Sequence, residues 1–251
     1  MSEVVLGIDT STRVCVGLAR DGEAVYSTAV GDTRSHVELL LPTVRDVMKK
    51  AGVSAKKLTA VAVGMGPGPF TGLRVGVAAA QMLATAWKLP LLQVCGLDVL
   101  GLTWAKTHPQ GDFVACIDAR RKELYWAVYD MHGKRIQGPD VSAPADLPHL
   151  PCIGPGTLLY PRAGAGMDSF LALKLGVRVD AMVSDWPQLE DVSGIVGIDA
   201  GVLAACASQL PDVGSEPLYL RHADAVAPGE AKSVLPTAMR HVGLASGERA
   251  V

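Results

Sequence analysis

The stretch of this sequence best suited to binding an anion runs from Gly64 to Gly76, and it holds five glycines and two prolines. Glycine allows a left-handed backbone and close approach, and proline fixes φ, so together they predict one well-defined loop. An apolar run at 58–63 precedes the loop, and a helical pattern follows it to about Trp87. The first turn of a helix leaves backbone N–H groups free to hold a phosphate. The Lys-Ser/Thr pair of a P-loop is missing, however, and Phe70 stands in the middle of the stretch.

A second interpretation of the same stretch concerns packing. Gly72, Gly76 and Ala80 recur every four residues, so one face of the predicted helix carries almost no side chain. Small residues at this spacing let another helix approach closely. That helix could belong to a partner, or the face could pack on the chain's own sheet, and the sequence leaves both open.

Two aspartates, Asp9 and Asp118, each end an apolar strand pattern and precede a polar turn. In each case a second apolar strand and a glycine-containing turn follow, which suggests two copies of one β-hairpin in a duplicated α/β domain. Each carboxylate could belong to a vestigial nucleotide or metal site, with hydroxyls such as Thr10 and Ser11 binding phosphate. Alternatively, each could accept hydrogen bonds from the backbone of its own turn.

Composition excludes several classes of protein. At 251 residues and 49% hydrophobic content, the chain can form one large or two medium domains with a real core. A net charge of −2 offers no electrostatic footprint for nucleic acid. The five cysteines are odd in number and contain no C-x-x-C, which indicates reduced core residues of a cytoplasmic protein. We expect neither a signal peptide nor a membrane span, because no basic leader and no apolar run of about 18 residues occurs.

Hydrophobic periodicity predicts the elements that position these residues. Short apolar runs predict strands at 4–8, 14–19, 24–29, 58–63, 89–94, 114–118, 124–129 and 152–153. Helical patterns cover 37 to about 48, the stretch after the glycine-rich loop to about 87, 96–106 and 198–210. Between 138 and 166 the pattern is irregular, and from about 221 the chain is polar and expected to be poorly ordered.

Six motifs then occur in a recognisable order. They are Ile8-Asp9-Thr10-Ser11-Thr12, His36-x-x-Leu39-Leu40-Leu41-Pro42, Gly66-Pro67-Gly68-Pro69-Phe70-Thr71-Gly72-Leu73-Arg74-x-Gly76, Ile117-Asp118-Ala119-Arg120, Glu123-x-Tyr125-Trp126 and Pro217-x-Tyr219-Leu220-Arg221. In this order they resemble the TsaB (YeaZ) family, bacterial accessory subunits for forming threonylcarbamoyladenosine (t6A) in tRNA. The resemblance covers roughly residues 4–222 and is closest in the first 130. The family usually has serine where this chain has Pro69, so a ligand contact through that hydroxyl is not expected here.

The resemblance implies an actin-like ATPase, ribonuclease H-like, duplicated α/β fold with two subdomains. The first would take residues 1–104 plus about 196–222 and carry partner-binding helices. The second would take 105–195, and 223–251 would be a flexible tail. In this superfamily the two aspartate-bearing turns face each other and hold the phosphates and metal of ATP.

The function implied is that of a non-catalytic scaffold subunit. It would bind TsaD and, with TsaE, support transfer of threonylcarbamoyl to N6 of adenosine 37 in tRNAs reading ANN codons. TsaD holds a metal through two histidines in an H-x-x-x-H pattern. Here the six histidines include no pair four apart, so we expect no metal site and no catalytic residues. The chain would need no cofactor beyond a weak ATP or ADP contact at the complex interface, and would meet tRNA only indirectly.

Two sets of candidate site residues follow from the resemblance. The partner-binding set is His36, Leu39, Leu40, Gly72, Arg74, Gly76 and Ala80, and the possible nucleotide contacts are Asp9, Thr10, Ser11 and Asp118. Alternatives are an ATP-dependent actin-like kinase or hydrolase using the two aspartates, and a homodimer through the same helices. If the small-residue face meets a partner, Gly76→Leu should leave the monomer folded and abolish TsaD binding.

Overall fold

The computed structural model describes residues 2–30, 36–107, 111–160 and 198–221. Met1–Arg221 forms one compact unit, within which the strands form two sheets. The predicted tail and the segment 161–197 lie outside the described residues, so the subdomain boundaries stay a prediction.

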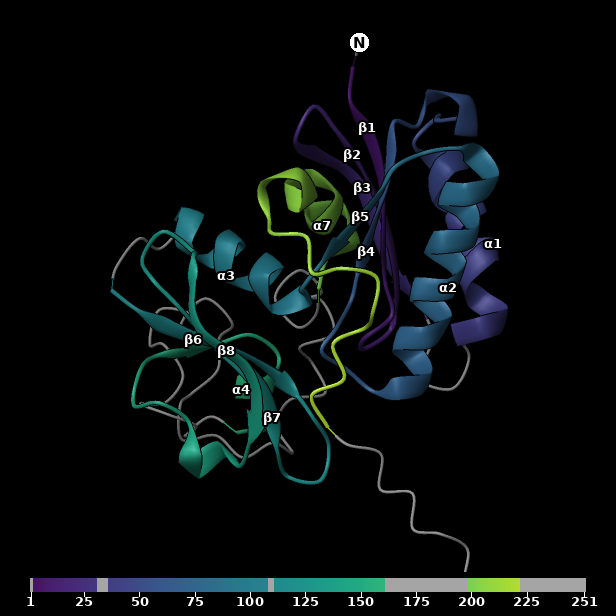
Figure 1. Ribbon diagram of the computed structural model, residues 1–251. Helices are drawn as coiled ribbons and strands as arrows, with labels where there is room; N and C mark the ends of the chain where they lie inside the picture. Colours follow the sequence, from purple (N-terminus) through teal and green to yellow (C-terminus); the bar gives the residue numbers. More distant parts are fainter. Residues whose placement is uncertain (1, 31–35, 108–110, 161–197, 222–251) are drawn as a thin grey trace, which may run out of the picture. The chain divides into compact units, whose positions relative to one another are not determined.

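The first sheet has five strands in the order β3-β2-β1-β4-β5 (Figure 1). They are β1 (Val4–Asp9), β2 (Val14–Arg20), β3 (Glu23–Val30), β4 (Ala60–Gly64) and β5 (Leu91–Val94). The first three pair antiparallel as a meander, whereas β4 and β5 join β1 in parallel. The parallel strands need helical crossovers, which are α1 (His36–Lys50, followed by the 3-10 turn η1, Ala55–Lys57) and α2 (Phe70–Trp87).

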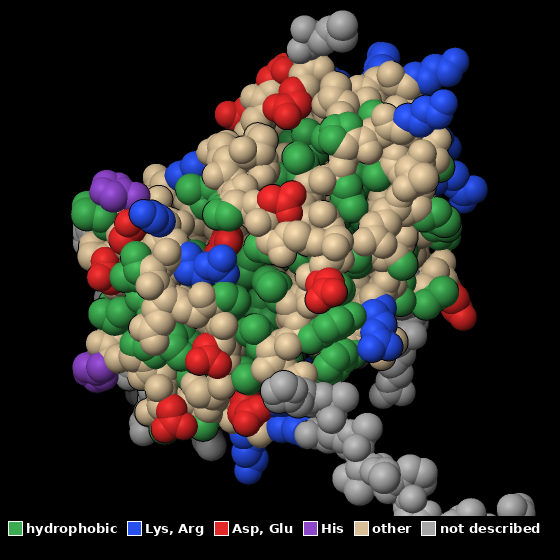
Figure 2. Space-filling model, in the orientation of Figure 1, with side chains coloured by type: hydrophobic (Ala, Val, Ile, Leu, Met, Phe, Trp, Pro, Cys, Tyr) green, Lys and Arg blue, Asp and Glu red, His purple; other side chains and the backbone are tan. Residues whose placement is uncertain are grey.

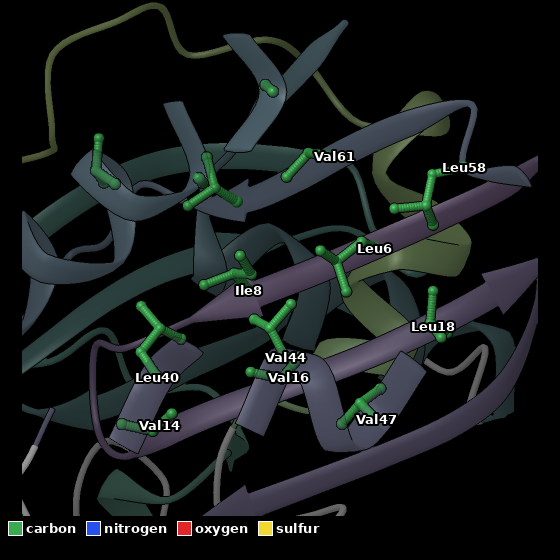
Figure 3. Packing of buried hydrophobic residues seen from close by; sticks show 14 of the residues in the cluster. Leu6, Ile8, Val14, Val16, Leu18, Leu40, Val44, Val47, Leu58 and Val61 are labelled. Carbon is green, nitrogen blue, oxygen red and sulfur yellow. The ribbon is translucent and has the colours of Figure 1, made fainter. Parts of the chain in front are cut away.

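Helices cover both faces of this sheet. Figure 1 shows α1 and α2 side by side on one face and α7 (Ala200–Cys206, continued by η5, Ala207–Gln209) on the other. On the α1 side, Leu40, Val44 and Val47 point from the helix onto the strands (Figure 3). On the α7 side, the paired glycines Gly7 and Gly17 let the helix lie directly on the backbone.

The second sheet has four strands in the order β8-β7-β6-β9. They are β6 (Phe113–Asp118), β7 (Leu124–Tyr129), β8 (Arg135–Ser142) and β9 (Cys152–Ile153). Helix α3 (Gly96–Thr107) packs against β6, β7 and β8 and also contacts α7. The buried Tyr129 hydroxyl donates a hydrogen bond of 2.7 Å to Asp98 Oδ1 of α3. The short η2 (Pro144–Asp146) and α4 (Gly156–Leu159) lie between β8 and the end of the described segment.

The duplicated hairpin predicted from the sequence is confirmed. Asp9 pairs with Cys15 across β1 and β2, and Asp118 pairs with Leu124 across β6 and β7, so the two turns have the same length. In each turn the aspartate Oδ1 accepts a hydrogen bond from the backbone two residues later, from Ser11 N at 2.9 Å and from Arg120 N at 2.8 Å. The two halves therefore share both topology and local hydrogen bonding.

Strand β8 was not predicted, and the physical reason is its exposure. It is an edge strand whose residues are mostly exposed or half-buried, so it lacks the apolar alternation on which strand prediction depends. The predicted helix at 198–210 is shorter and ends as a 3-10 turn.

The cysteines belong to the core as expected, because all five are buried and free. Among the helices that the structure describes, none combines the length and hydrophobicity that crossing a bilayer requires.

Candidate functional site

The turn after β1 lies directly beneath the glycine-rich loop. Asp9, Thr10 and Ser11 are 0%, 1% and 3% exposed. Thr10 Oγ1 donates a hydrogen bond of 2.7 Å to the carbonyl of Gly72. A Cβ atom at Gly76 would lie 2.1 Å from Thr10 Oγ1, so only glycine allows this approach.

Two further glycines of the loop have the same role. A Cβ atom at Gly64 would lie 1.9 Å from Asp9 Oδ2, and one at Gly68 would lie 2.9 Å from Ser11 Cβ. Direct packing of the loop on the turn thus explains why these three positions are glycine.

Burial controls the chemistry of Asp9. Its Oδ1 accepts hydrogen bonds from Ser11 N and Ser11 Oγ at 2.9 and 2.6 Å, and its Oδ2 is buried without a hydrogen-bond partner among the described residues. Desolvation raises the pKa of Asp9 to about 6 from the ordinary 3.8, and the two bonds from Ser11 act in the opposite direction. Asp9 is therefore a structural carboxyl group inside the fold.

The turn after β1 is covered by the chain itself. Gly68, Gly72 and Gly76 occupy the space beside Thr10 and Ser11 by direct contact. Asp9, Thr10 and Ser11 are therefore buried, and their contact with a nucleotide stays a prediction.

The flat face of α2 also points into this chain. Gly72, Gly76 and Ala80 are buried, and Ala80 belongs to the core cluster beneath α1 and α2. They therefore cannot form a surface for a partner helix, and of the two interpretations the structure selects packing on the chain's own sheet. The expectation for Gly76→Leu is corrected for the same reason, because the side chain would collide with Thr10 within the monomer.

The residues of α1 that were predicted to contact a partner also lie partly in the core of this chain. Leu40 is 1% exposed in the core, and Leu39 is half-buried against it. His36 is the first residue of α1, and its side chain lies outside what the structure describes.

The apolar side chains that do face outward on these helices are different ones. Val37 and Leu41 on α1 are 72% and 46% exposed, and Met82 on α2 is 52% exposed. The helical pattern at 37–48 includes these two residues of α1. Only Leu40, Val44 and Val47 of the pattern form the buried stripe, and Val37 and Leu41 lie beside it.

Arg74 takes part in a cluster that the sequence did not predict. Its Nε donates to the Tyr219 hydroxyl at 3.3 Å, and its guanidinium carbon lies 5.8 Å from the ring centroids of both Phe70 and Tyr219. The two rings stack with centroids 4.7 Å apart. The segment 217–221, which we call the strap, is thereby held against the start of α2.

The strap continues to the second hairpin. Leu218 N donates to the carbonyl of Met65, Arg221 donates to the carbonyl of Ala119 at 3.0 Å, and Arg221 also pairs with Glu123. Tyr219 and Arg221 belong to the last of the six sequence motifs, and sequence patterns alone predict no role for them.

The second turn is open to solvent. The side chain of Asp118 is 22% exposed and pairs with Arg120 at 3.4 Å. The next three residues, Arg120, Arg121 and Lys122, are exposed, so this turn places basic side chains at the protein surface. On the face in Figure 2, acidic and basic side chains are interspersed among hydrophobic ones. Within the described ranges, no group of three His, Cys, Asp or Glu residues is arranged to hold a metal ion.

One family model and several known proteins match this sequence. The family model described as TsaD: tRNA N6-adenosine threonylcarbamoyltransferase matches residues 32–240. An uncharacterized protein of Mycobacterium leprae is 38% identical over 88% of this chain, which spans 56% of that relative. The tRNA threonylcarbamoyladenosine biosynthesis protein TsaB of Escherichia coli is 29% identical over 87% of this chain and 94% of its own length.

Solved structures agree on the fold. YeaZ from Pseudomonas aeruginosa superposes with a TM-score of 0.61 at 24% identity, covering 87% of this chain and 100% of that one. A second structure, described as similar to peptidase YeaZ from Pseudomonas aeruginosa, gives a TM-score of 0.58 at 28% identity with the same coverage. The fold is the actin-like α/β fold with two subdomains. The chain therefore belongs to the TsaD family and, within it, to the TsaB (YeaZ) proteins.

Proposed function

We propose that this chain takes part in t6A biosynthesis as a non-catalytic subunit. It would bind TsaD through the outward face of α1 and α2 and, with TsaE, support transfer of threonylcarbamoyl to adenosine 37 of tRNA. The observation that carries the proposal is the outward apolar face of two adjacent helices in a chain whose relative is named for t6A biosynthesis.

The docking surface is defined by Val37, Leu41 and Met82, which we call the α1–α2 surface. Val37 and Leu41 lie one turn apart on α1, and α2 lies beside that helix (Figure 1). Contiguous apolar patches, unlike single exposed residues, mark protein interfaces, and the proposal is that these three side chains belong to one such patch. A matching pair of helices on TsaD could cover them and close a four-helix bundle. A homodimer would use the same surface, so the two assemblies should compete.

The absence of catalysis in the proposal is supported by the filled first turn. Asp9 is buried, and the glycine-rich loop packs directly on its turn. The alternative of an ATP-dependent kinase or hydrolase would require this carboxylate to be open to a nucleotide. Acyl transfer is therefore left to TsaD, and this chain acts by shaping or stabilising TsaD.

The experiment compares charged substitutions on and off the surface. Val37→Glu/Leu41→Glu should abolish co-elution with TsaD, because burying two unpaired carboxylates in an apolar contact is costly. Val25→Glu on β3 and Ile136→Glu on β8 are matched controls, since both side chains are exposed and apolar but lie on other elements. Affinity measured by calorimetry should fall at least about a hundredfold for the double variant, or about 3 kcal/mol, and stay unchanged in the controls. A folded double variant with unchanged affinity would contradict the proposal.

A further inference from the structure

The turn Arg120–Lys122, here called the basic turn, has an uncommon backbone. Arg120, Arg121 and Lys122 have φ values of 63°, 54° and 63°, so three consecutive residues with long side chains adopt the left-handed region. Outside glycine, asparagine and aspartate this region is sparsely used, and single residues rather than runs visit it.

Hairpin length does not require this conformation. The turn after β1 has the same length, and none of its residues Thr10 to Val14 has a positive φ. The left-handed run therefore belongs to the second turn specifically. Strained backbone of this kind persists where surrounding contacts hold it, and it is concentrated at ligand contacts.

Surrounding contacts hold the basic turn from both sides. Ala119 N donates to the carbonyl of Glu123 and Glu123 N donates to that of Arg120, both at 3.0 Å. The strap adds Arg221, which donates to the carbonyl of Ala119 and pairs with Glu123. Three basic side chains are thus exposed on a fixed backbone, and one of them, Arg120, also pairs with Asp118.

We propose that the basic turn contacts the phosphate backbone of RNA in the assembled complex. Adjacent Arg and Lys side chains on a fixed backbone are suited to phosphate oxygens, which supply most of the affinity of proteins for nucleic acid. The inference rests on the proposed function, which brings this chain to tRNA. Because the net charge of the chain is −2, the contact is weak in the isolated protein and adds to the affinity of the assembly.

The test uses Arg120→Asn/Arg121→Asn/Lys122→Asn, because asparagine tolerates the left-handed region while removing all three charges. The matched control, Lys49→Gln/Lys56→Gln/Lys57→Gln, removes the same charge from exposed positions on α1 and η1. Binding of unmodified tRNA is measured by fluorescence titration from about 20 to 200 mM salt, both for the isolated chain and for the complex with TsaD.

For the triple asparagine variant we expect affinity about tenfold or more lower at the lowest salt. The slope of log affinity against log salt should fall by about two to three, roughly one for each lost phosphate contact. The lysine control should keep the wild-type slope.

Equal slopes for wild type and the triple asparagine variant, or no measurable tRNA binding by either wild-type sample, would overturn the inference. Weakened binding of ATP with unchanged binding of tRNA would overturn it too, since the basic turn would then serve a nucleotide. Complex formation is followed separately by size exclusion, so its failure counts against the proposed function, whereas a complex that forms and binds tRNA with an unchanged salt slope counts against the basic turn alone.

Discussion

The turn after β1 and the turn after β6 have the same length and the same backbone hydrogen bond to an aspartate, but their surroundings are opposite. In the first, Asp9 is fully buried, and glycines of the loop pack directly on Asp9, Thr10 and Ser11. In the second, Asp118 is partly exposed, and the following residues are basic and left-handed. The turn of the first hairpin belongs to the core, and the turn of the second lies at the surface.

The two copies of the hairpin thus differ in what they contact. In the first, the hydrogen bond from Thr10 to Gly72 ties the glycine-rich loop and α2 to the sheet. Among the described residues no loop covers the second turn, and the strap fixes it from one side. Substitutions in the two turns should therefore affect different properties, stability in the first and binding in the second.

The largest effect is expected for Gly64→Ala, which breaks the packing in the first turn. Its Cβ would lie 1.9 Å from the buried Asp9 Oδ2, so loop or carboxylate must move. We expect a loss of about 3 kcal/mol or more in the free energy of unfolding, measured with denaturant. Gly52→Ala is the control, because Gly52 is left-handed but has nothing within 4 Å, and it should cost only about 1 kcal/mol. Equal losses would show that the contact with Asp9 is unimportant.

Asp9→Asn should remove a pH dependence of stability. Because the pKa of folded Asp9 is about 6 and the ordinary value is 3.8, the folded protein holds a proton that the unfolded chain releases between these values. The stability that protonated Asp9 contributes is full below about pH 4 and is lost as the pH rises through about 6. A pKa difference of about two corresponds to about 3 kcal/mol.

Unfolding midpoints measured from pH 4 to pH 8 should therefore fall more steeply for wild type than for Asp9→Asn. Asp118→Asn in the other turn is the matched control, since that side chain is partly exposed and has Arg120 beside it. Parallel curves for wild type and Asp9→Asn would rule out a buried, protonated Asp9.

Arg221→Gln should loosen the second turn while leaving the first intact. It removes a hydrogen bond to Ala119 and a pair with the half-exposed Glu123, so we expect a loss of about 1 kcal/mol. Hydrogen exchange should speed up at residues 119–123 and not at 9–14. Arg45→Gln, on an exposed position of α1, serves as control. Faster exchange in both turns would mean that the strap supports the whole unit.

The smallest effect is expected for Lys122→Gly. Glycine adopts the left-handed region without steric cost. The free energy of unfolding of the variant, measured by thermal denaturation, should therefore rise by about 0.5–1 kcal/mol. Thr12→Gly in the first turn should lower the free energy of unfolding, because no residue of that turn has a positive φ whose strain glycine could remove. If Lys122→Gly is destabilising, the backbone of the basic turn is not strained.

Much of the architecture was predictable from the sequence. In strongly patterned segments, such as α1 and the Ile-Asp strands, the apolar residues themselves indicate which side is buried. The duplicated hairpin could be predicted from these strands. Edge strand β8 was missed because its residues are mostly exposed. The direction of the flat face of α2 could not be known, since small residues fit equally well against a partner or against Thr10. The stack of Phe70 and Tyr219 joins residues far apart in the chain, which local patterns do not reveal.

The most direct test of the account is reconstituted t6A formation with TsaD, TsaE, tRNA and threonylcarbamoyl-adenylate, with wild type, with Asp9→Asn, and without this chain. We predict that omission abolishes modification, that Asp9→Asn supports it as well as wild type does, and that this chain alone releases no phosphate from ATP. Loss of modification with a folded Asp9→Asn protein that still binds TsaD would contradict the account and favour an enzyme that uses Asp9.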